Sequence, residues 1–120
     1  MVAGSPLRDE IWLVSLEPTK GAEMRKTRPC LVISPDEMNR HLRTVLIAPM
    51  TTVARAYPTR VALSFQGKRG QVALDQIRAV DRRRLVRRTG KASPVTVQAV
   101  SGVLIEMFAR GRSAAPTLAR

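Results

Sequence analysis

Short apolar runs rich in β-branched residues recur along much of the chain and predict β-strands. Proline or glycine lies between most of these runs, and Pro49 is expected to bring the third strand to a close near Thr51 and Thr52. A later run alternates polar and apolar residues, which indicates a strand with one face in water. The predicted strands are residues 11–16, 30–34, 44–48, 60–65 (the alternating run), 71–74 and 77–80.

Two other segments have patterns that favour helices. Residues 36–42 have room for about two helical turns. Ser93 is a good cap residue and Pro94 suits the first helical position, so we expect a helix from there to about Arg110. Its apolar residues are three or four positions apart and form one stripe that should pack on the sheet. The stripe consists of Val97, Val100, Val103, Leu104, Met107 and Phe108.

Short strands followed by one terminal helix are typical of a mainly β fold, a small and strongly curved antiparallel sheet or barrel. The 120 residues fit a single domain, residues 1–120. We expect order over about residues 8–110, between a flexible N-terminus and a C-terminal tail. Because a barrel of this size buries little surface by itself, a symmetric homodimer is expected.

The formal net charge of +12 predicts a positive field that concentrates polyanions around the protein. RNA, DNA or an acidic protein is therefore the expected partner, although an arginine-rich organism would give the same composition without one. The arginine-rich segment 82–88 has two interpretations, phosphate contact or a solvated basic rim.

Several kinds of site are excluded by the sequence. Cys30 is the only cysteine and His41 the only histidine, so no intrachain disulfide, multi-cysteine zinc site or histidine pair can form. Cys30 is expected in the core and His41 on a solvated helical face. Acidic residues are scattered, and nucleotide-binding and zinc-helix motifs are missing, so we expect no metal and no cofactor. No apolar stretch approaches the ~18 residues of a membrane span, and a cytoplasmic protein is expected.

Polar residues gather at the predicted strand ends, and they converge if three neighbouring strands end on one rim. They are Glu23, Lys26, Arg28, Thr51, Thr52, Asp75, Gln76 and Arg78. Several short motifs also occur in a fixed order: EIWLVSLEPTKG at residues 10–21, RPCLVIS at 28–34, APMTT at 48–52, YP at 57–58 and DQIR at 75–78. Together, over roughly residues 8–110, these motifs resemble the MazF/PemK toxins.

The resemblance implies an SH3-like small β-barrel of the CcdB/PemK kind with a C-terminal helix, and a homodimer. It also implies the toxin of a type II toxin–antitoxin system, a metal-independent endoribonuclease (mRNA interferase) that cleaves single-stranded RNA at specific sequences. A cognate acidic antitoxin is the implied inhibitor. By position, the family's arginine, threonine and acidic loop residue correspond to Arg28, Thr51 and Glu23, and its Asp-Gln step to Asp75 and Gln76.

One loop departs from the family pattern. The family often has Gly-Ser-Glu-Gln there, whereas this chain has Ala22 before Glu23 and Met24 after it. Any substrate contact made by that serine hydroxyl or that glutamine amide is therefore missing.

RNA carries its own nucleophile, the 2′-OH, so a metal-free enzyme must align it, accept its proton and stabilise charge on the phosphoryl oxygens. Arg28 suits the last task because its guanidinium stays charged and can donate two parallel hydrogen bonds. Thr51 is expected to position a phosphate oxygen. Glu23 or Asp75 could accept the proton only with a raised pKa, which the surrounding positive charge opposes, so the base is left open.

Each candidate has an ordinary structural alternative: a surface salt bridge for Arg28, a plain strand residue for Thr51, and ion pairs for Glu23 and Asp75. Aromatic residues are only 3% of the chain, so charge and hydrogen bonds should dominate RNA binding. The expected RNA-binding residues are Lys20, Lys26, Thr52, Tyr57, Gln76 and Arg78. The second hypothesis is a non-catalytic protein on the same fold, directed at DNA gyrase or nucleic acid.

Overall fold

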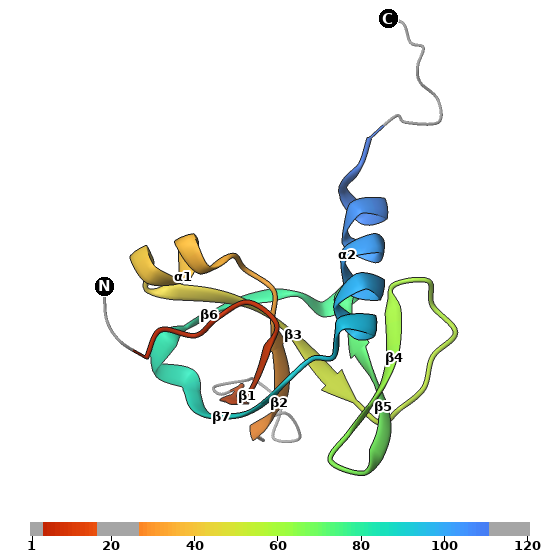
Figure 1. Ribbon diagram of the computed structural model, residues 1–120, viewed down its shortest axis with the longest axis horizontal. Coiled ribbons are helices and arrows are strands. Elements are labelled where there is room, and N and C mark those ends of the chain that lie inside the picture. The colour runs from red at the N-terminus through yellow and green to blue at the C-terminus, as the bar shows by residue number, and fades with distance from the viewer. Residues whose placement is uncertain (1–3, 17–26, 111–120) are drawn as a thin grey trace, which may run out of the picture.

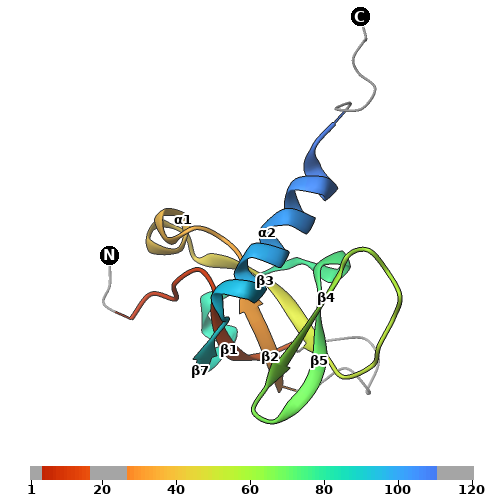
Figure 2. The same ribbon diagram turned by 45° about the vertical axis from the view of Figure 1, so that its right-hand side comes forward.

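The computed structural model describes residues 4–16 and 27–110. Its elements are β1 (Glu10–Ser15), β2 (Thr27–Val32), α1 (Asp36–His41), β3 (Thr44–Thr51), β4 (Arg60–Phe65), β5 (Lys68–Ala73), the 3-10 helix η2 (Leu74–Gln76), β6 (Arg78–Asp81), the 3-10 helix η3 (Arg82–Arg84), β7 (Leu85–Lys91) and α2 (Pro94–Phe108). The strands form a seven-stranded antiparallel sheet in the order β4-β5-β3-β2-β1-β7, with β6 paired to β3. The sheet curls strongly, and α2 lies against one side of it (Figures 1 and 2). The predicted small β-barrel fold with a C-terminal helix is confirmed.

The central strand, β3, changes partner along its length. It pairs with β2 on one edge, and on the other edge first with β6, as far as Ile47, and then with β5 from Met50. β3 runs through Pro49 and ends at Thr51, close to where it was predicted to end. Pro49 lies where the ladder on the second edge is interrupted, the kind of position at which a strand tolerates a missing N–H.

Two apolar clusters lie on opposite faces of the sheet, because alternate residues of a strand point to opposite sides. One is centred on Leu31, Ala48 and Met50, and α2 packs against it; the other contains Cys30, which is fully buried as predicted. Of the predicted stripe on α2, Val97, Val100, Val103, Leu104 and Met107 contact the first cluster. Phe108, at the end of the helix, was predicted in this stripe but is 68% exposed.

Side-chain hydrogen bonds fix both helices. The Ser93 hydroxyl accepts a hydrogen bond from the Thr96 N–H at 3.3 Å, which confirms the predicted cap of α2. Buried Asn39 of α1 donates to the carbonyls of Pro6 and Ser34, and the Ser34 hydroxyl donates to Asn39 Oδ1 at 2.6 Å. The side chain of His41, on the solvated side of α1, is 65% exposed, as expected.

One strand was not predicted. The arginine-rich segment forms η3 and then β7, which pairs with β1 and closes one end of the sheet. Arg88 of β7 forms an ion pair with Glu10 at 2.9 Å. Glu10 Oε1 also accepts a hydrogen bond from the indole N–H of Trp12, which is partly buried. Part of this basic segment is therefore structural. Within residues 4–16 and 27–110, no helix is long and apolar enough to span a membrane.

Candidate active site

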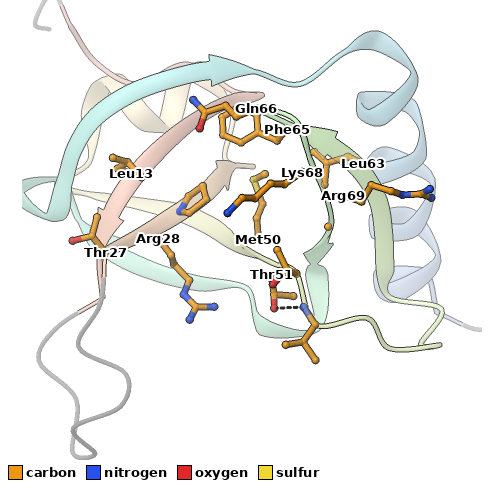
Figure 3. A pocket seen from close by; sticks show the side chains of 14 residues that line it. Leu13, Thr27, Arg28, Met50, Thr51, Leu63, Phe65, Gln66, Lys68 and Arg69 are labelled. Atoms are coloured by element: carbon orange, nitrogen blue, oxygen red, sulfur yellow. Dashed lines mark hydrogen bonds between the residues drawn. The ribbon is translucent and has the colours of Figure 1, made fainter.

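A pocket of about 470 Å³ opens beside the last residues of β3 (Figure 3). Strand residues form its apolar floor, and the rim is polar and basic. The floor consists of Leu13, Pro29, Met50, Leu63 and Phe65, and the rim of Thr27, Arg28, Thr51, Thr52, Val53, Gln66, Lys68, Arg69 and Gly70. The volume lies within the ~300–1,000 Å³ of ordinary small-ligand pockets.

Arg28 and Thr51 share one side of this pocket. In the antiparallel pairing of β2 with β3, Cys30 is opposite Pro49, and Arg28 and Thr51 both lie two residues beyond this pair at the same end. Because strand side chains alternate between faces, both project from the same face of the strand pair (Figure 3). The pairing therefore brings a guanidinium and a hydroxyl to the same side of the pocket.

Each residue of this pair has a donor group that no described residue engages. Arg28 Nε is buried and has no hydrogen-bond partner among the described residues. The Thr51 hydroxyl oxygen accepts a hydrogen bond from the Val53 N–H at 3.0 Å, which orients the hydroxyl and leaves its proton free to donate. A buried donor without a partner costs about 1–3 kcal/mol.

The positive charge of Arg28 is joined by that of Arg78, since both act on the thiol of Cys30. Burial raises the pKa of this thiol to about 12, and the two arginines only partly oppose the rise. Cys30 therefore stays protonated and is not a candidate nucleophile. Arg78 itself is exposed and belongs to β6, beside the pocket rather than in its lining.

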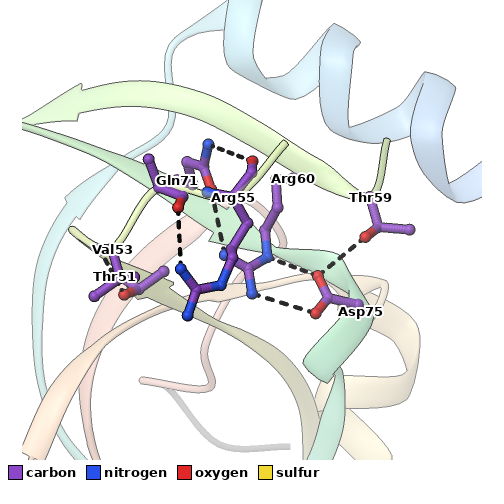
Figure 4. A network of polar contacts seen from close by, with 8 residues as sticks. Thr51, Val53, Arg55, Thr59, Arg60, Gln71 and Asp75 are labelled. Carbon is purple, nitrogen blue, oxygen red and sulfur yellow. Dashed lines mark hydrogen bonds and ion pairs between the residues drawn. The ribbon is translucent and has the colours of Figure 1, made fainter. Parts of the chain in front are cut away.

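A second polar network lies outside the pocket and joins η2 to the loop after β3 (Figure 4). Arg60 donates to Asp75 Oδ1 at 2.8 Å and to Gln71 Oε1 at 3.2 Å, and its side chain is only 6% exposed. Gln71 holds the backbone of Arg55 through two further bonds, each of 3.1 Å. The Arg60 guanidinium also lies 5.1 Å from the centroid of the Tyr57 ring, a cation–π contact. The network thus fixes the loop that directly follows Thr51.

Asp75 is poorly placed to act as a general base. The hydrogen-bonded Arg60 guanidinium holds the pKa of its carboxyl below the ordinary value, and the Thr59 hydroxyl acts in the same direction. A base near neutral pH needs the opposite shift. The structural alternative given above, an ion pair with a nearby arginine, describes Asp75 in this structure.

We expect Asp75→Asn to change how the melting temperature depends on pH. Because the pKa of Asp75 is lowered by folding, its ion pair stabilises the protein above the unfolded-state pKa of about 3.9, and this stabilisation is lost as pH falls through the lower folded-state value. At pH 7 the variant should melt below wild type, and the difference should shrink towards pH 3. Glu37→Gln, which breaks an exposed pair on α1, serves as the control. A difference that stays constant from pH 7 to 3 would contradict this role.

The predicted convergence of polar strand-end residues is therefore partial. Arg28, Thr51 and Thr52 meet at the pocket, whereas Asp75 pairs with Arg60. Gln76 and Tyr57 are exposed and lie outside the pocket lining. Lys20, Glu23 and Lys26, together with Ala22 and Met24, fall outside the described residues.

Sequence reasoning missed the contribution of the β4–β5 hairpin, which begins with the predicted strand at residues 60–65. Gln66, Lys68 and Arg69 from this hairpin line the pocket opposite Arg28. Two adjacent basic residues at a tight turn were the available signal. Across residues 4–16 and 27–110, no group of three or more histidine, cysteine, aspartate or glutamate side chains is placed to hold a metal ion.

A family model described as "PemK-like, MazF-like toxin of type II toxin-antitoxin system" matches residues 7–108. The chain belongs to this toxin family. The family resemblance predicted from the ordered motifs is thus confirmed.

Relatives in the family carry endoribonuclease names. The endoribonuclease toxin MazF of Escherichia coli K12 is 36% identical over 93 residues, which cover 77% of this chain and 83% of the relative. The endoribonuclease PemK of Escherichia coli is 43% identical over 79 residues, or 62% of this chain, and the match spans only 59% of that relative.

The fold agrees with solved members. An endoribonuclease from a mycobacterial species, in complex with its cognate antitoxin, superposes with a TM-score of 0.71 at 27% identity. The match covers 84% of this chain and 92% of that one.

Proposed function

We propose that this PemK/MazF-family chain is a sequence-specific endoribonuclease that cleaves single-stranded RNA, including mRNA, as the toxin of a type II pair. The observation that carries the proposal is the placement of Arg28 and Thr51 on one face of the same pocket. The endoribonuclease names of the E. coli relatives support it. We infer that the protein acts in the cytoplasm, where mRNA is found.

In the proposed reaction the ribose 2′-oxygen attacks the adjacent phosphorus while the bond from phosphorus to the 5′-oxygen breaks. The products are a 2′,3′-cyclic phosphate and a 5′-OH. Arg28 stabilises the negative charge that builds on the phosphoryl oxygens, and the Thr51 hydroxyl holds one of these oxygens in place. The step needs no metal, because RNA supplies the nucleophile and Arg28 the positive charge.

The proton of the 2′-OH needs an acceptor, and the leaving 5′-oxygen needs a proton. Of the two carboxylates considered, Glu23 is the one we propose as acceptor, since Asp75 is held by Arg60 with a lowered pKa. Arg28 is the secondary candidate for proton donation. We further propose that Thr52 and Arg78, next to the pair, contact the RNA, with Lys20 and Lys26 before Arg28.

Incubation with short single-stranded RNA in EDTA should give fragments with a cyclic phosphate and a 5′-OH, read by mass spectrometry. A 2′-deoxy substitution at the cleaved nucleotide should abolish cutting, because it removes the nucleophile. Cleavage that requires added Mg²⁺, or that survives the deoxy substitution, would contradict the mechanism. Binding to DNA gyrase without RNA cleavage would favour the non-catalytic alternative.

We also propose an acidic antitoxin and a second copy of the chain as partners. The net charge of +12 favours an acidic protein segment, and the mycobacterial relative was solved with its cognate antitoxin. Ile105 and Phe108 of α2 are 66% and 68% exposed, and we propose that one of these partners covers them.

A further inference from the structure

The β4–β5 hairpin forms the pocket wall opposite Arg28, and its turn is rigidly defined. Gln66 and Gly67 both have positive φ, at 53° and 80°. Two consecutive residues of this kind are typical of the tight two-residue turn that matches the twist of the flanking strands. The pairing across the turn places Phe65 opposite Lys68, and this fixes the position of the Lys68 backbone.

The two basic residues after the turn point in different directions. Lys68 extends across the mouth of the pocket towards the side where Arg28 lies, whereas Arg69 points away from it (Figure 3). This follows from the alternation of side chains along β5. Both are exposed, and no carboxylate of the described residues forms an ion pair with either. The Lys68 ammonium group is therefore available to an anion at the pocket.

The pocket that contains Arg28 and Lys68 also has an apolar floor, which includes Met50, Leu63 and Phe65. A pocket with two cations and an apolar floor matches the chemistry of single-stranded RNA, in which charged phosphates alternate with flat bases. A free phosphate or an acidic side chain would leave this floor uncovered. The pocket volume of about 470 Å³ is enough for one nucleotide.

We propose that Lys68 binds the phosphate next to the one held by Arg28, with the intervening base on the apolar floor. The proposal rests on the RNA-cleaving function proposed above and adds a second phosphate subsite to it. Lys68 acts on substrate binding rather than on the chemical step, because its phosphate is not the one that reacts.

The test uses single-stranded RNA with 2′-O-methyl groups throughout, which removes the nucleophile, and follows binding by fluorescence anisotropy at several salt concentrations. Lys68→Ala should weaken binding about tenfold. It should also reduce the slope of log affinity against log salt by about 0.7, the value for one phosphate of a single strand. Arg40→Ala removes one positive charge from α1, outside the pocket lining, and is the control, with a change of about twofold or less.

The double variant Arg28→Ala/Lys68→Ala distinguishes two phosphates from one. If the residues bind neighbouring phosphates, the slope should fall by about 1.4, whereas a shared phosphate should leave the fall near 0.7. The latter result, or an equal loss in Arg40→Ala and Lys68→Ala, would overturn the subsite.

Cleavage kinetics separate this proposal from the function on which it rests. Lys68→Ala should raise KM about tenfold with kcat nearly unchanged, which is the signature of lost uniform binding. If wild type binds the methylated RNA but does not cleave the unmodified RNA, the ribonuclease proposal fails and the binding data still decide the role of Lys68. Wild type that binds no RNA at all would overturn both.

Discussion

Arg28→Ala is expected to lower kcat for RNA cleavage by about 10²–10³-fold. Removal of one preorganised donor to a developing oxyanion typically costs this much, and an arginine that serves phosphoryl transfer can contribute more. The side chain lies at the pocket, and no described residue forms an ion pair with its guanidinium. Single-turnover cleavage of a defined RNA measures the effect directly.

Arg28→Lys tests the geometry of the guanidinium separately from its charge. Lysine keeps the charge but cannot give two parallel hydrogen bonds, so an intermediate rate is expected. Arg40→Ala is the matched control, because Arg40 pairs with Glu37 on α1, next to the other end of β3. Its rate should equal that of wild type. Arg28→Ala that cleaves within tenfold of wild type, with a wild-type melting curve, would remove Arg28 from the mechanism.

The elements most accurately predicted from sequence are those whose burial leaves an apolar signature. Val45, Ile47 and Ala48 of β3 are completely buried, and the β-branched run that contains them marked the strand correctly. The apolar stripe of α2 was predicted correctly for the same reason as far as Met107. Phe108 lies beyond the core cluster. β7 was not predicted, because it is held mainly by pairing with β1. Its arginine side chains are exposed, so the segment has no apolar signature.

The candidate site was predictable where it depends on local position and unpredictable where it depends on distant contacts. Arg28 and Thr51 lie at the ends of neighbouring strands, and antiparallel pairing brings such ends together. The partner of Asp75 is Arg60, fifteen residues away, and no local pattern indicates that pair. Lys68 reaches the pocket only because β5 pairs with the end of β3, which is a property of the folded sheet.

The same β3–β5 contact makes Gly70 a positioning residue for Thr51. A Cβ atom added at Gly70 would lie 2.8 Å from the Thr51 carbonyl oxygen, 3.5 Å from the Thr51 carbonyl carbon and 3.9 Å from the Thr52 Cα. All three contacts are with backbone, which cannot move aside as a flexible side chain can. Since Thr51 is paired opposite Gln71, the added methyl group must shift either β5 or the end of β3.

Gly70→Ala should therefore lower kcat about 10²-fold, because a misplacement of about 1 Å at a reacting group has effects of this size. Overpacking should also cost roughly 1–3 kcal/mol of stability, so the cleavage rate must be measured at a temperature where melting shows the variant to be folded. Gly102→Ala on α2 is the control: an added Cβ there meets nothing within 4 Å, and alanine favours the helix by about 0.5–1 kcal/mol. It should cleave at the wild-type rate.

A mutant cycle shows whether Gly70 acts through Thr51 or only through stability. Thr51→Ala removes the hydroxyl that the shift would misplace, so in that background Gly70→Ala should lower kcat much less than it does in wild type. A purely structural effect would multiply with that of Thr51→Ala. Equal fold-losses in both backgrounds would thus show that the close approach of β5 serves the fold alone, and an unchanged rate in Gly70→Ala would show that the site tolerates the shift.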